Sequence, residues 1–419
     1  MFKIFRQLFN PTNKDLRKKI YFTLFCLGVF CLGTTITIPW ASVVYEELGF
    51  LEIFNLMSGG GLQQFSIFAL GVSPYITASI ITQLLQMDII PYFKELKEQG
   101  YVGRQKINKI TRYLGIFFAF VQAYVFCIAY LGTNDVGMLI KTSVVMTAGT
   151  AFCLWMGDQI SKKGLGNGVS MLILAGIVQS MPRMFMTAFD SLVTSGTFST
   201  VTGSILFGVY ISLYILIIVG VVWIQLAERR IPIQYSNKTN SAYGAQQSFL
   251  PIKINSAGVL PVIFASTLTS VASAVVQFLG NDSAVNFVNK WIAYTSPTGF
   301  VLYMLLILFF GYFYTFLSMN PEEMSKNLNK NGGYIPGVRP GVDTSDHISN
   351  ILSKLTIIGT GFLIAIAGLP IIFANVSGLP STVTLGGTGL LIIVGVAVES
   401  YKQIESSLVS RSYKRSKRR

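Results

Sequence analysis

Residues that carry out chemistry in enzymes are scarce in this sequence of 419 residues. Charged side chains make up 12% of the chain, and the single histidine, His347, falls in a predicted loop. The sequence contains no phosphate-binding glycine loop, no His and Cys at metal-binding spacing, and no nucleophile beside a general base. We therefore expect neither an enzyme nor a bound cofactor or metal.

Cysteine is also scarce. The four cysteines, Cys26, Cys31, Cys127 and Cys153, all fall within apolar stretches. Their positions suggest neither a disulfide framework nor a zinc site. We expect them to act as small apolar packing residues.

Apolar residues, in contrast, are abundant: 52% of the chain is hydrophobic and the mean hydropathy is +0.57. Stretches of about 20 apolar residues, long enough to cross a bilayer as a helix, recur along the whole chain. No polar stretch between them is long enough for a soluble domain. The sequence predicts an all-α polytopic membrane protein with ten spans, at about 20–40, 65–86, 113–132, 139–157, 169–187, 205–227, 255–279, 300–319, 353–373 and 386–401.

The distribution of Lys and Arg predicts the orientation of these spans. With the N-terminus in the cytoplasm, all but three of the 32 basic residues fall on the cytoplasmic side, the exceptions being Lys141, Arg183 and Lys290. Because cytoplasmic loops of membrane proteins are enriched in basic residues, we expect both termini to be cytoplasmic.

Ionisable side chains are missing from the interior of the predicted spans. Asp88, Asp158, Glu228 and Glu399 all lie at or near cytoplasmic helix ends. Ion-coupled transporters usually carry such side chains within the membrane. An ion-coupled pump is therefore disfavoured.

Five spans precede the hydrophilic gap near Asp190–Gly203, and five follow it. An odd number of spans means that the second half begins on the opposite side of the membrane, so related halves would form an inverted repeat with a functional site between them. We predict an N-terminal half at 1–190 and a C-terminal half at 204–419, which carries the cytoplasmic loops 228–254 and 320–352.

The apolar stretch Phe54–Leu85 cannot cross a membrane as one regular helix, because Ser58-Gly59-Gly60-Gly61 interrupts it. Each glycine costs about 1 kcal/mol relative to Ala in a helix, and each unpaired backbone group in lipid costs several kcal/mol. We predict a short helix around Phe54–Met57, a polar, mobile hinge through Gln64, and a spanning helix from about 65 to 86. A kinked membrane helix with ordinary packing is the alternative.

Side chains within the predicted spans suggest two further features. Val72 and Ile76 would share one face of the second span, because they are four residues apart. Gln83, Gln122 and Asn255 are polar residues within or at the start of spans. They could simply form hydrogen bonds between helices, or they could line a seam between two bundles that part.

Two predicted cytoplasmic loops combine basic and turn-forming residues. The first begins with Leu226–Lys238, and in the second, Asn320–Gly341, glycine and proline residues surround Arg339. Arg229, Arg230 and Arg339 could bind phosphates of RNA or acidic side chains of a motor protein. Alternatively, these arginines serve membrane topology alone.

Six segments resemble the signature blocks of the SecY/Sec61-alpha family. They are SGGGLQQFSIFALGVSPYITASIITQLL, KKGLGNGVSMLILAGIV, AERRIPIQY, INSAGVLPVIFAS, NPEEMSKNLNKNGGYIPGVRPG and LGGTGLLIIVGVAVESYKQIES, in the family's order. The similarity extends from about Lys18 to Tyr413. It implies ten transmembrane helices in two inverted five-helix halves, arranged as a clamshell around an hourglass-shaped pore.

The resemblance also implies roles for individual residues. Residues at about 54–66 match the plug of the resting channel, which includes Phe54, Asn55, Met57, Ser58, Gly59, Gly60 and Gly61. The apolar constriction ring corresponds to Val72, Ile76, Ile173, Ile263 and Ile392. Gln83, Gln122 and Asn255 match positions near the lateral gate, which spans two and three form against spans seven and eight. Arg229, Arg230 and Arg339 match loop arginines that contact the ribosome or the SecA ATPase.

By this resemblance the chain would be a protein-conducting channel of the general secretory pathway in the bacterial plasma membrane. It would pass unfolded polypeptides across the membrane and release transmembrane segments sideways into lipid, working with SecE, SecG, SecA, ribosomes and signal sequences. An accessory SecY for a few surface glycoproteins is the alternative within the family. A secondary transporter with inverted repeats and a structural scaffold are alternatives from other classes, but the first would need membrane-embedded ionisable residues and the second would leave the ring without a purpose.

Three places depart from the family pattern. Ile38-Pro39-Trp40-Ala41 stands where a second Pro and a Gly are usual, which could alter the outer loop. The loop tip Ser236-Asn237-Lys238 is less basic than in many relatives, so its contact with RNA should be weaker. The C-terminus ends in a short basic tail that suits either lipid headgroups or RNA.

Overall fold

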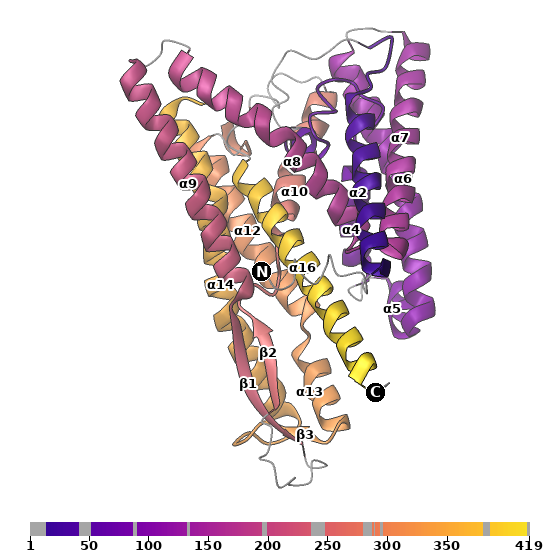
Figure 1. The fold of residues 1–419 in the computed structure, drawn as a ribbon, viewed down its shortest axis with the longest axis vertical. Helices are drawn as coiled ribbons and strands as arrows, with labels where there is room; N and C mark the ends of the chain where they lie inside the picture. The colour runs from indigo at the N-terminus through magenta and orange to yellow at the C-terminus, as the bar shows by residue number, and fades with distance from the viewer. Residues whose placement is uncertain are drawn as a thin grey trace.

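The computed structural model describes residues 14–41, 52–86, 90–131, 135–194, 199–235, 248–279, 287–288, 290–293, 296–379 and 386–416. Most of these residues are helical (Figure 1). The helices are α2 (Lys14–Thr35), α3 (Glu52–Met57), α4 (Ser73–Leu85), α5 (Pro91–Glu98), α6 (Gly100–Tyr130), α7 (Val136–Lys163), α8 (Gly168–Phe189) with the π-helical turn η3 (Asp190–Thr194), α9 (Thr200–Leu226), α10 (Leu260–Leu279), α12 (Pro297–Ser318), α13 (Pro321–Lys330), α14 (Val342–Ser377) and α16 (Gly386–Ser416).

Each of the ten predicted spans overlaps one of these helices. Within the described residues, six helical stretches are long and apolar enough by themselves to cross a membrane: 100–130, 136–163, 168–194, 200–226, 297–330 and 342–377. The predicted class, a helical polytopic membrane protein, is confirmed.

The second span begins later than predicted. Residues 58–72 form a series of turns, and helix α4 starts at Ser73 rather than near residue 65. Phe65 and Gly71 have positive φ angles of 46° and 53°, which a helix does not allow, and Pro74 lies in the first turn of α4, where proline is favoured. The predicted hinge therefore extends to Val72, and Val72 lies just before the helix instead of on its face.

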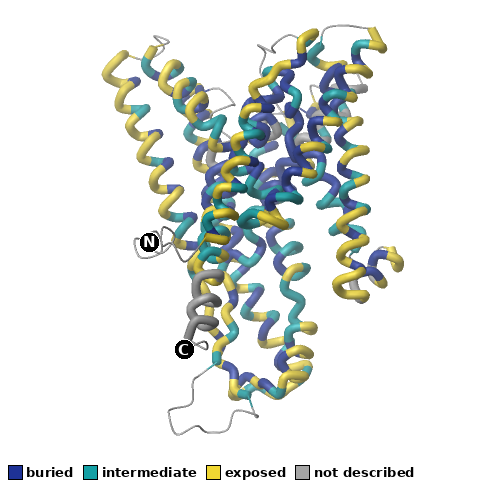
Figure 2. The backbone as a smooth tube through the Cα atoms, turned by 45° about the vertical axis from the view of Figure 1, so that its right-hand side comes forward, coloured by how far each residue is buried: buried dark blue, intermediate teal, exposed yellow. Residues whose placement is uncertain are grey.

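Buried residues concentrate where the helices cross, and exposed residues follow the outer helix faces (Figure 2). One hydrophobic cluster joins α8, α9, α10, α12, α14 and α16, and a second joins α2, α3, α7 and α8 to residues of α10 and α16. Many outer residues are large and apolar, among them Leu216, Val219 and Trp223 on α9. In a membrane protein such faces contact lipid or a partner helix.

A three-stranded antiparallel sheet extends from the helices at the predicted cytoplasmic side (Figure 1). Its strands are β1 (Glu228–Tyr235), β2 (Ser248–Lys253) and β3 (Gly333–Tyr334), in the order β2-β1-β3. One face packs on α13 and α14 through a cluster that includes Ile233, Ile252 and Leu352. The two predicted cytoplasmic loops thus form one unit, because β1 pairs with a strand from each.

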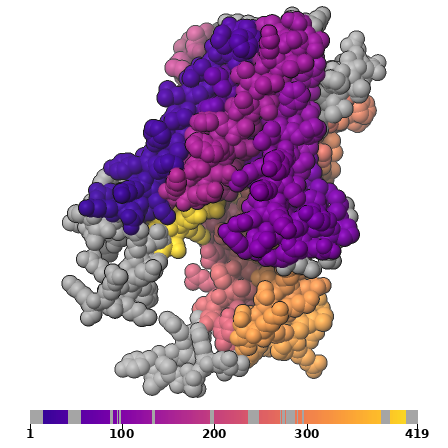
Figure 3. Space-filling model, turned by 90° about the vertical axis from the view of Figure 1, so that its right-hand side faces the viewer, coloured from indigo at the N-terminus to yellow at the C-terminus, as the bar shows by residue number. Residues whose placement is uncertain are grey.

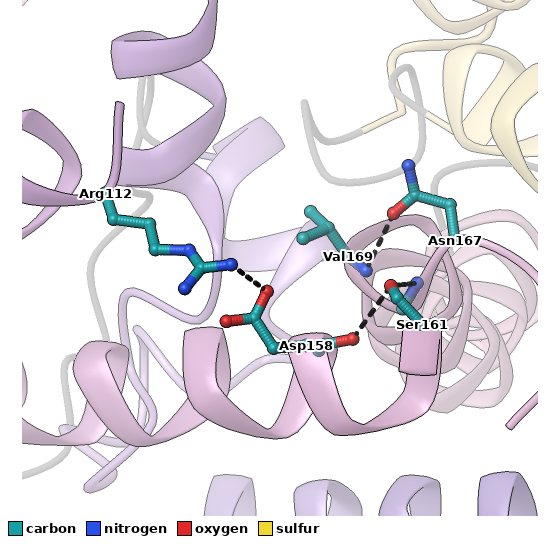
Figure 4. A network of polar contacts seen from close by, with 7 residues as sticks. Arg112, Asp158, Ser161, Asn167 and Val169 are labelled. Carbon is teal, nitrogen blue, oxygen red and sulfur yellow. Dashed lines mark hydrogen bonds and ion pairs between the residues drawn. The ribbon is translucent and has the colours of Figure 1, made fainter. Parts of the chain in front are cut away.

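A polar network ties α6, α7 and α8 together (Figure 4). The Arg112 guanidinium lies 2.6 Å from a carboxylate oxygen of Asp158, joining α6 to α7. The Ser161 hydroxyl donates to the carbonyl of Gly157 and accepts the N–H of Gly168, at 3.0 and 2.8 Å, joining α7 to α8. The sequence interpretation treated Asp158 only as a helix end and missed this ion pair.

Close packing between α12 and α14 generates a stability prediction. A Cβ atom at Gly311 would lie 2.0 Å from Cγ2 of Thr360, so Gly311→Ala forces these helices apart. Overpacking of this kind costs about 1–3 kcal/mol, and we expect a lower melting temperature in detergent. Gly361→Ala on α14 is the control, because nothing lies within 4 Å of its added methyl group. Equal melting temperatures for the two variants would contradict the packing described.

Candidate functional site

The interrupted segment, residues 52–72, consists of α3 and the turns that follow it. Its backbone is paired internally: Gly60 N–H donates to the carbonyl of Asn55 at 2.8 Å, and Ser66 N–H donates to that of Gly61 at 3.0 Å. Gly59 and Gly60 have φ angles of 73° and 82°, a conformation that favours glycine. The triple glycine is therefore used to fold the chain back on itself.

The segment packs on α8 and α2. A Cβ atom at Gly176 would lie 2.1 Å from the Met57 carbonyl oxygen, so α8 approaches the backbone of the segment directly. The Ser180 hydroxyl donates to the Leu56 carbonyl at 3.4 Å. On the other side, a Cβ atom at Gly33 of α2 would lie 2.0 Å from Cε2 of Phe68, and the Ile67 N–H donates to the Ile36 carbonyl, just after α2, at 3.0 Å.

The predicted plug residues are mostly buried in this position. Asn55, Met57 and Ser58 are buried, and the Asn55 side chain accepts the N–H of Gln63 at 3.1 Å. Phe54 belongs to α3 by its backbone, but its side chain lies outside the described part of the structure. The guanidinium of Arg183 lies 3.5 Å from Gln63 Oε1.

The five residues predicted to form the ring gather in one hydrophobic cluster. Four of them are buried, with exposed fractions of 1% for Val72, 6% for Ile173, 8% for Ile263 and 5% for Ile392. Ile76 is partly buried and packs against the same cluster. They come from the turn before α4 and from α4, α8, α10 and α16, so the fold brings together residues that are far apart in the sequence.

The interrupted segment touches this ring cluster. Leu56 and Met57 belong to the same set of packed hydrophobic residues. Leu56 also lies near α16, where a Cβ atom at Gly389 would be 3.1 Å from its Cδ2. Residues of the predicted plug and of the predicted ring therefore pack in one hydrophobic cluster.

The three polar residues predicted for the gate lie in separate environments. Gln83 donates to the Ser79 hydroxyl at 3.3 Å, within α4, and its buried Oε1 has no hydrogen-bond partner in the described part of the chain. Gln122 is half-buried on α6, which contacts α10. Asn255 is buried and donates to the Gly258 carbonyl at 3.0 Å. Across the described residues no hydrogen bond joins these three side chains to one another.

The predicted docking arginines are all exposed, but they do not point the same way. Arg229 and Arg230 are neighbours in β1, and successive side chains in a strand lie on opposite faces. Arg229 shares the face of the buried Ile231 and Ile233, whereas Arg230 shares the face of Glu228. The sequence interpretation placed both arginines in a loop, so it did not predict that their side chains lie on opposite faces of a strand.

Arg339 lies in the turn that connects β3 to α14. Its carbonyl accepts the hydroxyl of Thr344 at 2.8 Å, and the carbonyl of Gly341 accepts that of Ser325 at 2.8 Å. Gly337 and Gly341 have φ angles of 82° and 110°, which explains why glycine occupies both positions. The turn is thus fastened to α13 and α14 while the Arg339 side chain extends into solvent.

The remaining sequence predictions concern the cysteines, a metal site, the loop tip and the basic tail. The four cysteines are free, and the described residues include no group of three or more His, Cys, Asp and Glu side chains that could hold a metal ion. The loop tip at 236–238 and the last residues of the basic tail, 417–419, lie outside the described residues.

The contact between α8 and the interrupted segment can be tested by thiol labelling. Gly176→Ala would place a methyl group against the Met57 carbonyl and push the segment away. Ser58 is 0% exposed, so a cysteine introduced there should be protected in the parent chain and labelled roughly tenfold faster or more in the Gly176→Ala background. Gly208→Ala on α9 has open space around it and should leave the labelling rate unchanged. Continued protection in both backgrounds would contradict the contact.

Known proteins resemble this chain in both sequence and structure. A family model described as SecY matches residues 66–401. Proteins named Protein translocase subunit SecY from Bacillus subtilis (strain 168) and Streptococcus gordonii are 43% and 44% identical to the chain. The alignments cover 96% of both proteins for B. subtilis and 98% of both for S. gordonii.

Solved structures share the fold at lower sequence identity. One described as "The structure of a protein conducting channel" has a TM-score of 0.68 and 19% identity, and the match covers 94% of this chain and 93% of that one. Sec61 in a canine ribosome-channel complex has a TM-score of 0.63 and 18% identity, with the same coverage. Together with the family model and the relatives of nearly equal length, these matches show that the chain belongs to the SecY family.

Proposed function

We propose that this chain is the protein-conducting channel of the general secretory pathway. It passes unfolded polypeptides across the bacterial plasma membrane and releases transmembrane segments sideways into lipid. The observation that carries the proposal is one hydrophobic cluster, the ring cluster. It joins Val72, Ile76, Ile173, Ile263 and Ile392, from distant parts of the chain, to Leu56 and Met57 of the interrupted segment. Membership of the SecY family supports it.

An aliphatic ring suits a channel for polypeptides. A narrow apolar constriction blocks water and ions by dewetting. It also closes around a chain of any sequence, since it offers no charge that would hold some substrates and repel others. The five ring residues carry no polar group, so the ring can seal the resting channel and still release each segment that passes.

The interrupted segment serves as the plug of this channel. It covers the ring cluster through Leu56 and Met57, and few side-chain hydrogen bonds hold it to α8. Most of its backbone hydrogen bonds are internal and need not break when it moves. The two that join it to Ile36 and Ile38, after α2, must break or move with it. A signal sequence that separates the helices next to the plug would therefore displace it.

The lateral gate in this proposal lies between α4 and α6 on one side and α10 and α12 on the other, where α6 contacts α10. Gln83 and Gln122 on the first side, and Asn255 in the connection that precedes α10, make this seam less apolar than lipid. A segment leaves through the seam only if it is more hydrophobic than the seam itself. The gate separates an N-terminal half, residues 1–190, from a C-terminal half, residues 204–419.

Energy for transport comes from outside the chain, which we propose is not an enzyme. The sheet and the Arg339 turn form one exposed surface, on which the SecA ATPase or a ribosome docks. This surface faces the cytoplasm, where we also place both ends of the chain on the basis of the distribution of Lys and Arg. SecE and SecG complete the heterotrimer in the lipid bilayer. Solved structures of the same fold include an idle yeast Ssh1 complex bound to the 80S ribosome, at 14% identity and a TM-score of 0.63, which supports the docking proposal.

Photocrosslinking from the ring tests the channel proposal. A probe that replaces Ile76 should crosslink to a secretory polypeptide stalled during transport in native membranes, and only while that polypeptide is engaged. A probe that replaces Val219, an exposed residue on the outer face of α9, should stay silent under the same conditions. If both probes are silent while probes on the sheet still react, the docking surface stands but the pore assignment fails.

Docking is tested by comparing two exposed cations of the same loop. Arg339→Ala removes a guanidinium from a turn of fixed shape, and hydrogen bonds to charged groups contribute about 1.5–3 kcal/mol. We expect SecA to bind the reconstituted channel at least roughly tenfold more weakly. Lys330→Ala removes an exposed charge at the end of α13 and should have a small effect. Equal losses for the two variants would mean that only net charge matters.

A further inference from the structure

Helix α16 (Gly386–Ser416) extends toward the end of the molecule that also carries the sheet (Figure 1). Along its length it packs against α8 of the N-terminal half and α9 of the C-terminal half. In Figure 3 its yellow atoms emerge between the purple N-terminal helices and the pink and orange segments of the C-terminal half. Two successive residues of α16, Lys402 and Gln403, each contact a different part of the chain.

Gln403 reaches the N-terminal half. Its side-chain Oε1 accepts the backbone N–H of Gly166 at 2.9 Å. Gly166 has a φ angle of 73° and lies in the short connection between α7 and α8. Side chains also accept the neighbouring amides of this connection: Thr23 of α2 accepts that of Leu165 at 3.0 Å, and Ser161 of α7 that of Gly168 (Figure 4).

The bond from Gln403 therefore differs from the other two. Thr23 and Ser161 belong to the same half as the connection, and they hold it to α2 and α7. Gln403 belongs to the C-terminal half, so its bond crosses the boundary along which a clamshell would open. The Ser400 hydroxyl, one turn earlier on α16, lies 3.9 Å from the sulfur of Met171 and extends this contact along α8.

Lys402 contacts the C-terminal half. Its ammonium lies 3.4 Å from a carboxylate oxygen of Glu228, the first residue of β1. Glu228 shares its face of the strand with Arg230 and immediately precedes Arg229. The same turn of α16 is thus tied to the base of the proposed docking surface and to the N-terminal half.

We propose that Gln403 is a positioning residue that latches the two halves together at the cytoplasmic side, and that Lys402 links this latch to the sheet. A motor or ribosome that seats on the sheet and shifts β1 moves Lys402, which draws Gln403 away from Gly166. The inference rests on the proposed function, and it adds the route by which docking favours opening. Both bonds are exposed, so water can replace them each time the channel opens.

The latch is tested in the reconstituted heterotrimer, with the full chain in planar bilayers, by measuring how often the channel opens without a partner. Gln403→Ala removes the acceptor, and a single neutral hydrogen bond corresponds to an increase in opening of about 2- to 10-fold. Gln403→Glu keeps an oxygen that can accept the Gly166 amide and should restore parental behaviour. Glu405→Ala, an exposed neighbour on the same helix, is the matched control and should not differ from the parent.

The link to the sheet is tested by charge reversal. Lys402→Glu and Glu228→Lys should each reduce the extra opening that SecA, ATP and a secretory polypeptide produce, because the movement of β1 no longer reaches α16. The double variant restores an ion pair of opposite direction and should recover most of the stimulation. SecA binding, measured in parallel, should change less than the stimulated opening for Lys402→Glu.

Three results would overturn the inference: parental opening in Gln403→Ala, the same increase in Glu405→Ala, or a double reversal that behaves like the worse single variant. Ile263→Gly in the ring separates this failure from failure of the proposed function. If Ile263→Gly leaks ions while Gln403→Ala opens as often as the parent, the channel proposal is supported and the proposed role of Gln403 is wrong. If Ile263→Gly does not leak, the ring assignment itself is wrong, and any effect of Gln403 has another cause.

Discussion

The requirement that buried backbone groups find hydrogen-bond partners shapes the centre of this molecule. A helix meets that requirement by itself, but residues 58–72 are not helical and yet are mostly buried. Their amides are satisfied by turns, by the Asn55 side chain and by the strand-like pairing of Ser66 with Thr37 near the end of α2. Because the segment supplies most of its own pairing, it can pack against an apolar cluster that offers no polar partner.

Such a segment still needs a close fit, and glycines on the surrounding helices provide it. A Cβ atom at Gly176 of α8 would meet the Met57 carbonyl, and one at Gly149 of α7 would lie 2.0 Å from the carbonyl of Ile67. At these two glycines the helices approach the backbone of the segment directly. Close packing of this kind leaves little free space and therefore places the segment accurately.

Sequence reasoning succeeded where the signal was local. Long apolar runs located the spans, and the triple glycine at 59–61 located the break. It failed where similar composition encodes different structures: the residues from Phe65 to Val72 are as apolar as the helix after them, so hydropathy could not show that they form turns. It also missed the β1–β3 pairing and the Arg112–Asp158 ion pair, because each joins residues whose proximity only the fold determines. The ring assignment, which stays a prediction, came from family resemblance, since isolated aliphatic residues in apolar spans carry no signal of their own.

The two ends of α8 contact the C-terminal half in different ways, and this difference bears on how the halves move. At the predicted outer end, a Cβ atom at Gly203 of α9 would lie 2.1 Å from the carbonyl of Leu192, and Phe189 packs edge-on against Phe207. At the inner end, the contact includes the exposed hydrogen bond from Gly166 to Gln403. Separating the inner end costs a polar contact that water can replace, whereas separating the outer end would expose close-packed apolar surface. Relative movement of the halves should therefore pivot near the outer end of α8 and be largest on the side where the three-stranded sheet lies.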